Sequence, residues 1–105
     1  MKQPTLAALE KEIEGIKQQV VTMGEMRPGS LTLQYQSPKN KKGLFYQLSY
    51  THNMRSRTDY VRREFVDDLK KQIATYRRFK KLIKRWVDAS IQHSKLKLAL
   101  ATKKR

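Results

Sequence analysis

The first segment of the chain has the spacing of an amphipathic helix. Its apolar residues recur at steps of three and four, at Leu6, Leu9, Ile13, Ile16, Val20 and Met23. This is the heptad pattern of a helix with one apolar seam. Pro4 and Thr5 suit the start of a helix, Gly24 suits its C-terminal cap, and Pro28 lies beyond. The pattern predicts a helix over residues 5–24. Its seam, Leu6 to Val20, packs either on this chain or on a partner, including a second copy.

The middle of the chain alternates between apolar and polar residues, which is typical of half-buried strands. Strands are expected over residues 31–36, 44–51 and 55–61, joined by SPKNKKG at 37–43 and HNM at 52–54. The alternation therefore predicts a three-stranded antiparallel sheet within residues 31–61.

The cost of burying charge indicates the register of the second hairpin. A three-residue loop at 52–54 pairs Ser49 with Arg57, whereas a two-residue loop puts Arg57 and Asp59 beside Leu48 and Tyr50. Because burying unpaired charges is costly, the three-residue loop is favoured. One face then carries Leu33, Tyr35, Leu44, Tyr46, Leu48, Tyr50 and Tyr60. The other carries Thr32, Gln34, Gln36, Phe45, Gln47, Ser49, Thr51, Arg55 and Arg57.

A long helix is expected over residues 62–98, because apolar residues recur there at helical spacing and no Gly or Pro follows Gly43. The tail at 99–105 is expected to fray. The two helices are expected to pair, with one end of the long helix over the apolar sheet face. The fold class is thus α+β in a single domain.

Positive charge is the strongest signal of the composition. The chain of 105 residues has 24 Lys and Arg against 9 Asp and Glu, a net charge of +15. Residues 1–30 hold four basic and four acidic side chains, residues 31–61 five and one, and residues 62–105 fifteen and four. Such segregation favours an anionic partner over general solubility.

The segment YRRFKKLIKRW at 76–86 is the densest basic stretch. Its apolar residues share one helical face, and most of its charge lies on the other. This pattern suits phosphate binding, an interfacial membrane helix or a calmodulin-like target. We favour phosphate binding, because a second basic, polar surface is expected on the sheet. The candidate contacts are Arg77, Arg78, Lys80, Lys81, Lys84 and Arg85.

The polar sheet face offers a second candidate site. Arg55 and Arg57 are the leading candidates for hydrogen bonds to base edges in a nucleic-acid groove, with Gln34, Gln47 and Ser49 beside them. We give equal weight to the interpretation that these polar residues simply form the solvent-exposed face that antiparallel sheets usually have. Phe45 is a candidate for base stacking, and the loop residues Lys39, Lys41 and Lys42 are candidates for clamping the backbone.

Other classes of function find little support in the sequence. There is no cysteine, so disulfides and thiolate metal sites are excluded. His52 and His93 lack acidic neighbours at ligand spacing, and no cofactor or metal is expected. No catalytic constellation appears, so we expect no enzyme. There is no signal peptide and no run of about 18 apolar residues, so a cytoplasmic protein without membrane contact is expected.

Several motifs resemble a family of short prokaryotic proteins that tend to occur near transposase genes. They are MRPGSL at 26–31, LFYQLSYT at 44–51, RTDYV at 57–61 and IATYRRFKKL at 73–82. Most members carry cysteines between the first two strands, which suggests a small zinc site there. This chain has SPKNKKG instead and lacks those cysteines.

A weaker resemblance, in pattern alone, is to the arm-binding N-terminal domains of tyrosine recombinases. It covers about residues 31–75 and implies a three-stranded sheet laid on DNA, with contacts from Gln47, Ser49, Arg55 and Arg57. The sequence thus predicts a DNA-binding accessory protein of a mobile element or phage-like system. A protein that docks on an acidic partner and an RNA-binding protein remain as alternatives.

Overall fold

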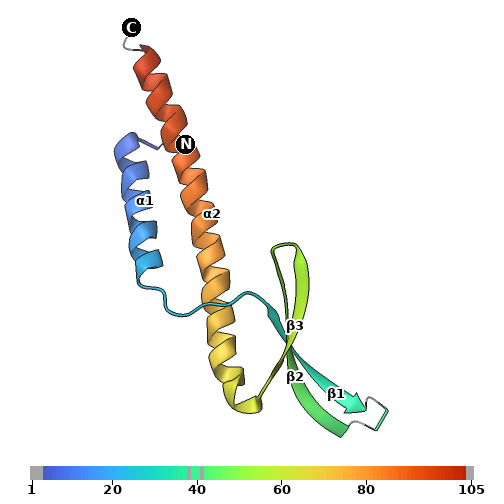
Figure 1. The fold of residues 1–105 in the computed structure, drawn as a ribbon. Coiled ribbons are helices and arrows are strands. Elements are labelled where there is room, and N and C mark those ends of the chain that lie inside the picture. Colours follow the sequence, from blue (N-terminus) through green and yellow to red (C-terminus); the bar gives the residue numbers. More distant parts are fainter. Residues whose placement is uncertain (1–3, 38, 41, 104–105) are drawn as a thin grey trace. The chain divides into compact units, whose positions relative to one another are not determined.

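The computed structural model describes residues 4–37, 39–40 and 42–103. The elements follow the order α1 (Leu6–Val21), β1 (Ser30–Ser37), β2 (Lys42–His52), β3 (Arg55–Val61) and α2 (Val66–Lys103), with a 3-10 turn over Arg63–Phe65 (Figure 1). The α+β fold class is confirmed. The chain forms two compact units: a helical unit of residues 1–23 and 78–105, and a sheet unit of residues 24–77.

Thr residues define both ends of α1. The Thr5 hydroxyl accepts a hydrogen bond from the Ala8 N–H at 3.1 Å, so Thr5 is the N-cap. At the other end Thr22 is the C-cap, and its hydroxyl donates to the Gln19 carbonyl at 2.9 Å. The expected cap at Gly24 is therefore wrong. The Thr22 hydroxyl satisfies a carbonyl of the last turn that lacks a backbone partner, and the helix ends before Gly24.

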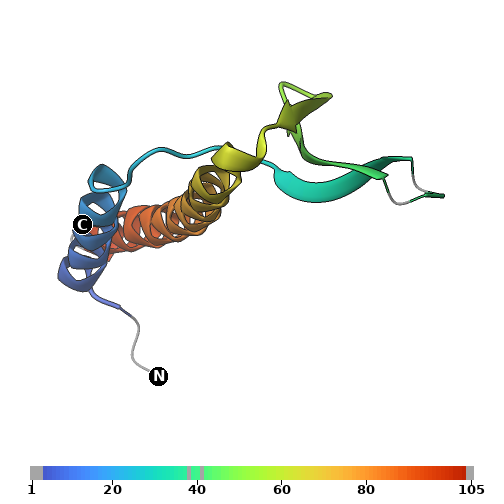
Figure 2. The ribbon, with the colours of Figure 1, turned by 90° about the horizontal axis from the view of Figure 1, so that it is seen from below.

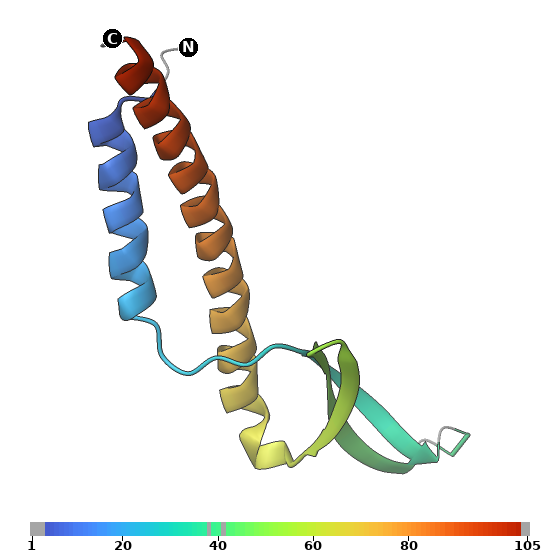
Figure 3. The ribbon, with the colours of Figure 1, turned by 45° about the horizontal axis from the view of Figure 1, so that its top comes forward.

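In the helical unit α1 runs antiparallel to the C-terminal part of α2 (Figure 3). Leu9 and Ile16 of the α1 seam are buried, as are Leu82 and Ala89 of α2. The His93 Nε2 atom lies 3.0 Å from the Glu10 Oε1 atom, and the Lys17 amino group lies 5.7 Å from the centre of the Trp86 ring. The expected pairing of the two helices is confirmed, and the heptad seam packs within this chain.

The helix α2 continues to Lys103, so the expected end at residue 98 is wrong. Residues 96–101 read LKLALA, and Leu, Lys and Ala are the strongest helix formers. Because no glycine or proline interrupts them, intrinsic propensity carries the helix through a segment expected to fray.

The sheet has the strand order β1-β2-β3, with both neighbouring pairs antiparallel, and it is visibly twisted (Figure 2). In the first hairpin Leu31 lies opposite Leu48 and Leu33 opposite Tyr46. The strands extend further than expected, because Ser37 pairs with Lys42. The predicted three-stranded antiparallel sheet is confirmed.

The predicted register of the second hairpin is wrong. His52 pairs with Arg55, so the loop has two residues, Asn53 and Met54, with φ of 51° and 63°. Two left-handed residues form the turn that matches the right-handed twist of the strands. The register puts Asp59 beside Leu48. That carboxylate is tolerated because it is about half exposed and forms an ion pair with Arg27.

The core of the sheet unit lies at one end of the sheet. Leu48, Leu69 and Ile73 are buried together, so the first turns of α2 cover the sheet there. Leu31, Tyr50 and Val61 pack around them. Tyr35, Leu33 and Leu44, expected in the core, are 36%, 50% and 58% exposed. The helix thus covers only part of the apolar face.

Candidate functional site

The uncovered face of the sheet presents hydrogen-bonding side chains around an aromatic pair. Residues opposite one another in a ladder project to the same face, and Thr32, Gln47 and Tyr60 form one such row. The described side chains of this polar sheet face are Ser30, Thr32, Gln34, Phe45, Gln47, Ser49, Thr51, Ser56, Thr58 and Tyr60. None of these is charged, and Thr51 and Ser56 hydrogen-bond at 3.2 Å.

The aromatic pair consists of Phe45 on β2 and Tyr60 on β3. Their ring centres are 5.4 Å apart and their planes meet at 64°, an edge-to-face arrangement. Tyr60 is 77% exposed, and Phe45 is half-buried. Sequence reasoning assigned Tyr60 to the core. The asparagine at 53 was the signal for the shorter loop, which moves Tyr60 to the polar face.

Arg55 and Arg57 lie on the opposite face from Gln47 and Ser49, so their predicted grouping is wrong. Arg57 pairs with Tyr50 and Arg55 with His52, on the side that carries Leu48. The cause is the one-residue difference in loop length, which turns every side chain of β3 over. Both arginines are exposed. They therefore face solvent, but on the apolar side of the sheet, beyond its buried end.

The lysines of the first hairpin loop are only partly placed. Lys39 lies in a turn and is exposed. Lys42 is the first residue of β2. Lys41 lies outside the described residues.

A basic helix face runs along α2 in the helical unit. Arg78, Lys81 and Arg85 follow one another at steps of three and four, and Lys84 lies beside them; we call these four residues the basic helix face. All four are exposed. Among the described residues, Arg78 and Lys81 have no acidic partner, whereas Arg85 lies 3.8 Å from Glu12. Phosphate groups have direct access to such side chains.

Lys84 is the most constrained cation of the basic helix face. Its amino group donates to Asp88, one turn along α2, at 2.8 Å. The hydrogen bond and the carboxylate charge raise the pKa of Lys84 above its usual value. The ammonium is therefore retained at physiological pH, with part of its charge balanced by Asp88.

The two remaining predicted cations lie elsewhere. Lys80 is exposed but lies around the helix from Arg78 and Arg85, toward the side of Ile83 and Val87. Arg77 is the last residue of the sheet unit, where it lines a shallow hollow with Leu31 and Ile73.

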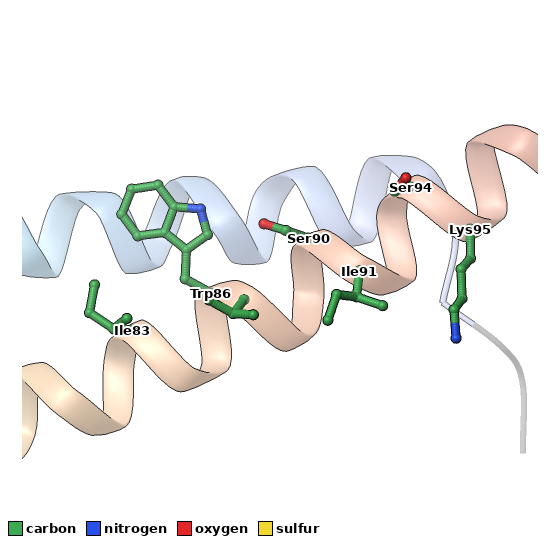
Figure 4. A pocket seen from close by; sticks show the side chains of 7 residues that line it. Ile83, Trp86, Ser90, Ile91, Ser94 and Lys95 are labelled. Atoms are coloured by element: carbon green, nitrogen blue, oxygen red, sulfur yellow. The ribbon is translucent and has the colours of Figure 1, made fainter.

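Sequence reasoning did not foresee that part of the apolar pattern of α2 is exposed in the helical unit. Ile83, Val87 and Ile91 recur every four residues, and Val87 and Ile91 are 51% and 49% exposed. They line an open hollow of about 540 Å³ together with Ser90, Ser94 and Lys95. Trp86 points toward α1, whereas Lys95 points away from it (Figure 4). The helix thus carries one apolar face packed on α1 and part of another facing solvent.

The described part of the chain holds no cluster of three or more His, Asp or Glu side chains able to bind a metal ion. None of its helices combines the length and the apolar character needed to cross a membrane.

Comparison of the chain with protein-family models, with curated proteins and with solved structures finds no match.

Proposed function

We propose that this protein binds nucleic acid, most directly DNA, with the basic helix face holding phosphates. The observation that carries the proposal is that Arg78 and Lys81 are exposed on one side of α2 without an acidic partner among the described residues. Lys84 and Arg85 adjoin them. Phosphate contacts of this kind supply most of the affinity of proteins for nucleic acid.

The charge balance of the helical unit supports the proposal. Its segments hold 13 basic and four acidic side chains in the sequence. Two of the acidic groups, Glu10 and Glu12, lie close to His93 and Arg85. The excess of positive charge is therefore available to an outside anion.

The polar sheet face supports base contact. Gln and Thr side chains can hydrogen-bond base edges, and no carboxylate of the described residues projects from this face. The resemblance to proteins encoded near transposases favours an accessory role in a mobile-element or phage-like system in the cytoplasm. That context is part of the proposal.

A salt titration tests the proposal. Labelled duplex DNA of mixed sequence is titrated with protein at increasing salt, and affinity is followed by fluorescence anisotropy. Neutralisation of four phosphates predicts a slope of log affinity on log salt of about −3 to −4. Undetectable binding of both duplex and single-stranded nucleic acid at about 50 mM salt contradicts the proposal, because electrostatic binding is strongest at low salt. The same titration with RNA separates the two nucleic acids.

Matched charge variants locate the contact. Replacing Arg78, Lys81 and Lys84 by Ala removes cations of the basic helix face. The control replaces Lys11, Lys97 and Lys103 in the same unit: Lys11 lies on α1, and the other two lie more than three turns beyond Arg85 along α2. We expect the first variant to lose at least about tenfold in affinity and to have a shallower salt slope, and the control to stay closer to wild type. Equal losses in both variants would point to net charge alone.

The apolar stripe favours a second candidate function, docking on an acidic protein helix. An amphipathic partner helix docks on apolar residues that recur about once per helical turn, as do Ile83, Val87 and Ile91. The stripe is bordered by two basic residues, Lys84 and Lys95, which would attract an acidic partner. Replacing Val87 and Ile91 by Gln separates the two functions. DNA binding stays unchanged under the primary proposal, whereas binding of an acidic partner is lost.

A further inference from the structure

We infer that Phe45 and Tyr60 form a stacking site for an unpaired base, so that the ligand of the polar sheet face is a single-stranded nucleic acid. This inference rests on the proposed function and specifies its substrate class. It follows from the observed hairpin register, which brings the two rings onto one open face.

The exposure of the pair points to a ligand. Tyr60 is 77% exposed on the edge strand, although its ring packs in an edge-to-face arrangement with the Phe45 ring. A flat aromatic surface open to solvent can accept the face of a base, and such stacking is tolerant of sequence. Bases within a duplex are already stacked on one another, so only an unpaired base offers its face.

The surroundings of the pair suit the rest of a nucleotide. Gln47 lies directly opposite Tyr60, and Thr32 lies opposite Gln47 on the next strand. Their amide and hydroxyl groups can hydrogen-bond the edge of a stacked base or its sugar. Asp59, the neighbour of Tyr60, projects from the other face and is paired with Arg27, so its charge does not oppose an incoming phosphate.

Charge complementarity supports the same occupant. The sheet unit holds 11 basic and five acidic side chains in the sequence. The sheet unit attracts a polyanion as a whole, while its uncharged polar face leaves base contact to aromatic and hydrogen-bonding groups.

The test uses a thymidine oligonucleotide carrying one 2-aminopurine, whose fluorescence falls when an aromatic ring stacks on it. Wild type should quench the probe. Tyr60→Ala should bind about 5- to 100-fold more weakly, with most of the quenching lost, whereas Tyr60→Phe should stay within about twofold of wild type. Phe45→Leu keeps an apolar side chain and should also weaken binding. Tyr35→Ala is the matched control, because it removes a partly exposed tyrosine from the opposite face.

The outcomes separate this inference from the proposed function. If wild type binds neither single strands nor duplex, both are overturned. If it binds duplex with the expected salt slope but Tyr60→Ala binds the oligonucleotide as wild type does, only the stacking site is overturned. Tighter binding of duplex than of the single strand also overturns it. Urea unfolding of each variant checks that the sheet is intact.

Discussion

Arg27 and Asp59 form an ion pair that ties the segment before β1 to β3. The Arg27 guanidinium donates to the Asp59 carboxylate and lies 4.9 Å from the centre of the Tyr50 ring. The backbone N–H of Arg27 donates to the Gln72 carbonyl of α2 at 3.2 Å. One residue therefore links a strand, an aromatic side chain and the helix that covers the sheet.

Replacing Arg27 by Ala should lower the stability of the protein. Both side chains are partly exposed, so solvent screens the ion pair, and the loss should be about 1 kcal/mol from the ion pair and the ring contact together. Urea unfolding measures it. In a double-mutant cycle with Asp59→Asn, a coupling of about 0.5 kcal/mol is expected, and no coupling would mean that the pair contributes nothing.

Gly29→Ala should be strongly destabilising. Gly29 has φ of 139°, and a Cβ added there would lie 2.7 Å from a Leu48 methyl carbon and 3.1 Å from the Ser49 carbonyl oxygen. Backbone strain and the clash with buried Leu48 together should cost about 2–4 kcal/mol. Thermal unfolding is the measurement.

Gly15→Ala is the matched control for that substitution. A Cβ at Gly15 meets nothing within 4 Å, and Gly15 lies inside α1. Alanine is the better helix former, so this variant should gain about 0.5–1 kcal/mol. Similar effects of the two substitutions would contradict the geometry described for Gly29.

Two substitutions of Met54, in the turn between β2 and β3, should change the stability of the protein in opposite directions. Met54 is 99% exposed and left-handed, with φ of 63°. Met54→Gly removes the strain of a side chain in that conformation and should stabilise the protein by about 1 kcal/mol. Met54→Val should destabilise it, because β-branched residues are the least suited to positive φ. The midpoints of thermal unfolding give both signs. A loss of stability in Met54→Gly would argue against the two-residue turn.

Ile16→Ala should disrupt the packing of α1 on α2. Ile16 is 1% exposed, and truncating such a residue costs about 2–5 kcal/mol. The single tryptophan, Trp86, lies under Lys17 of α1, so its emission should shift to the red as the contact loosens. Val21→Ala is the control on the same helix, because Val21 is 74% exposed. An unchanged emission in Ile16→Ala would contradict the packing.

The local pattern of apolar and polar residues was sufficient to predict most of the helices and strands. Steps of three and four in α1 and alternation in β1 and β2 reflect the periods at which a helix and a strand turn one face to a core. These periods are properties of short segments, so the helices, the strands and their antiparallel order could be predicted from them. The gathering of cations at 77–85 is equally local.

The composition of the two sheet faces was decided by tertiary structure. The choice between two loop lengths was made on the cost of burying Arg57 and Asp59. The partner of Asp59, Arg27, lies more than thirty residues earlier in the chain. A sequence read locally does not reveal that pair. Because side chains alternate strictly along a strand, the register that brings Asp59 to Arg27 also places Arg57 on the face of Leu48 and Tyr60 on the polar sheet face.

The sequence by itself determined the elements, their order and the excess of positive charge, because each depends on the identity of residues close along the chain. Only the tertiary structure decided which side chains meet. It packed the heptad seam on α2, left Val87 and Ile91 exposed, and joined Phe45 to Tyr60, because burial and register depend on contacts between segments distant in sequence.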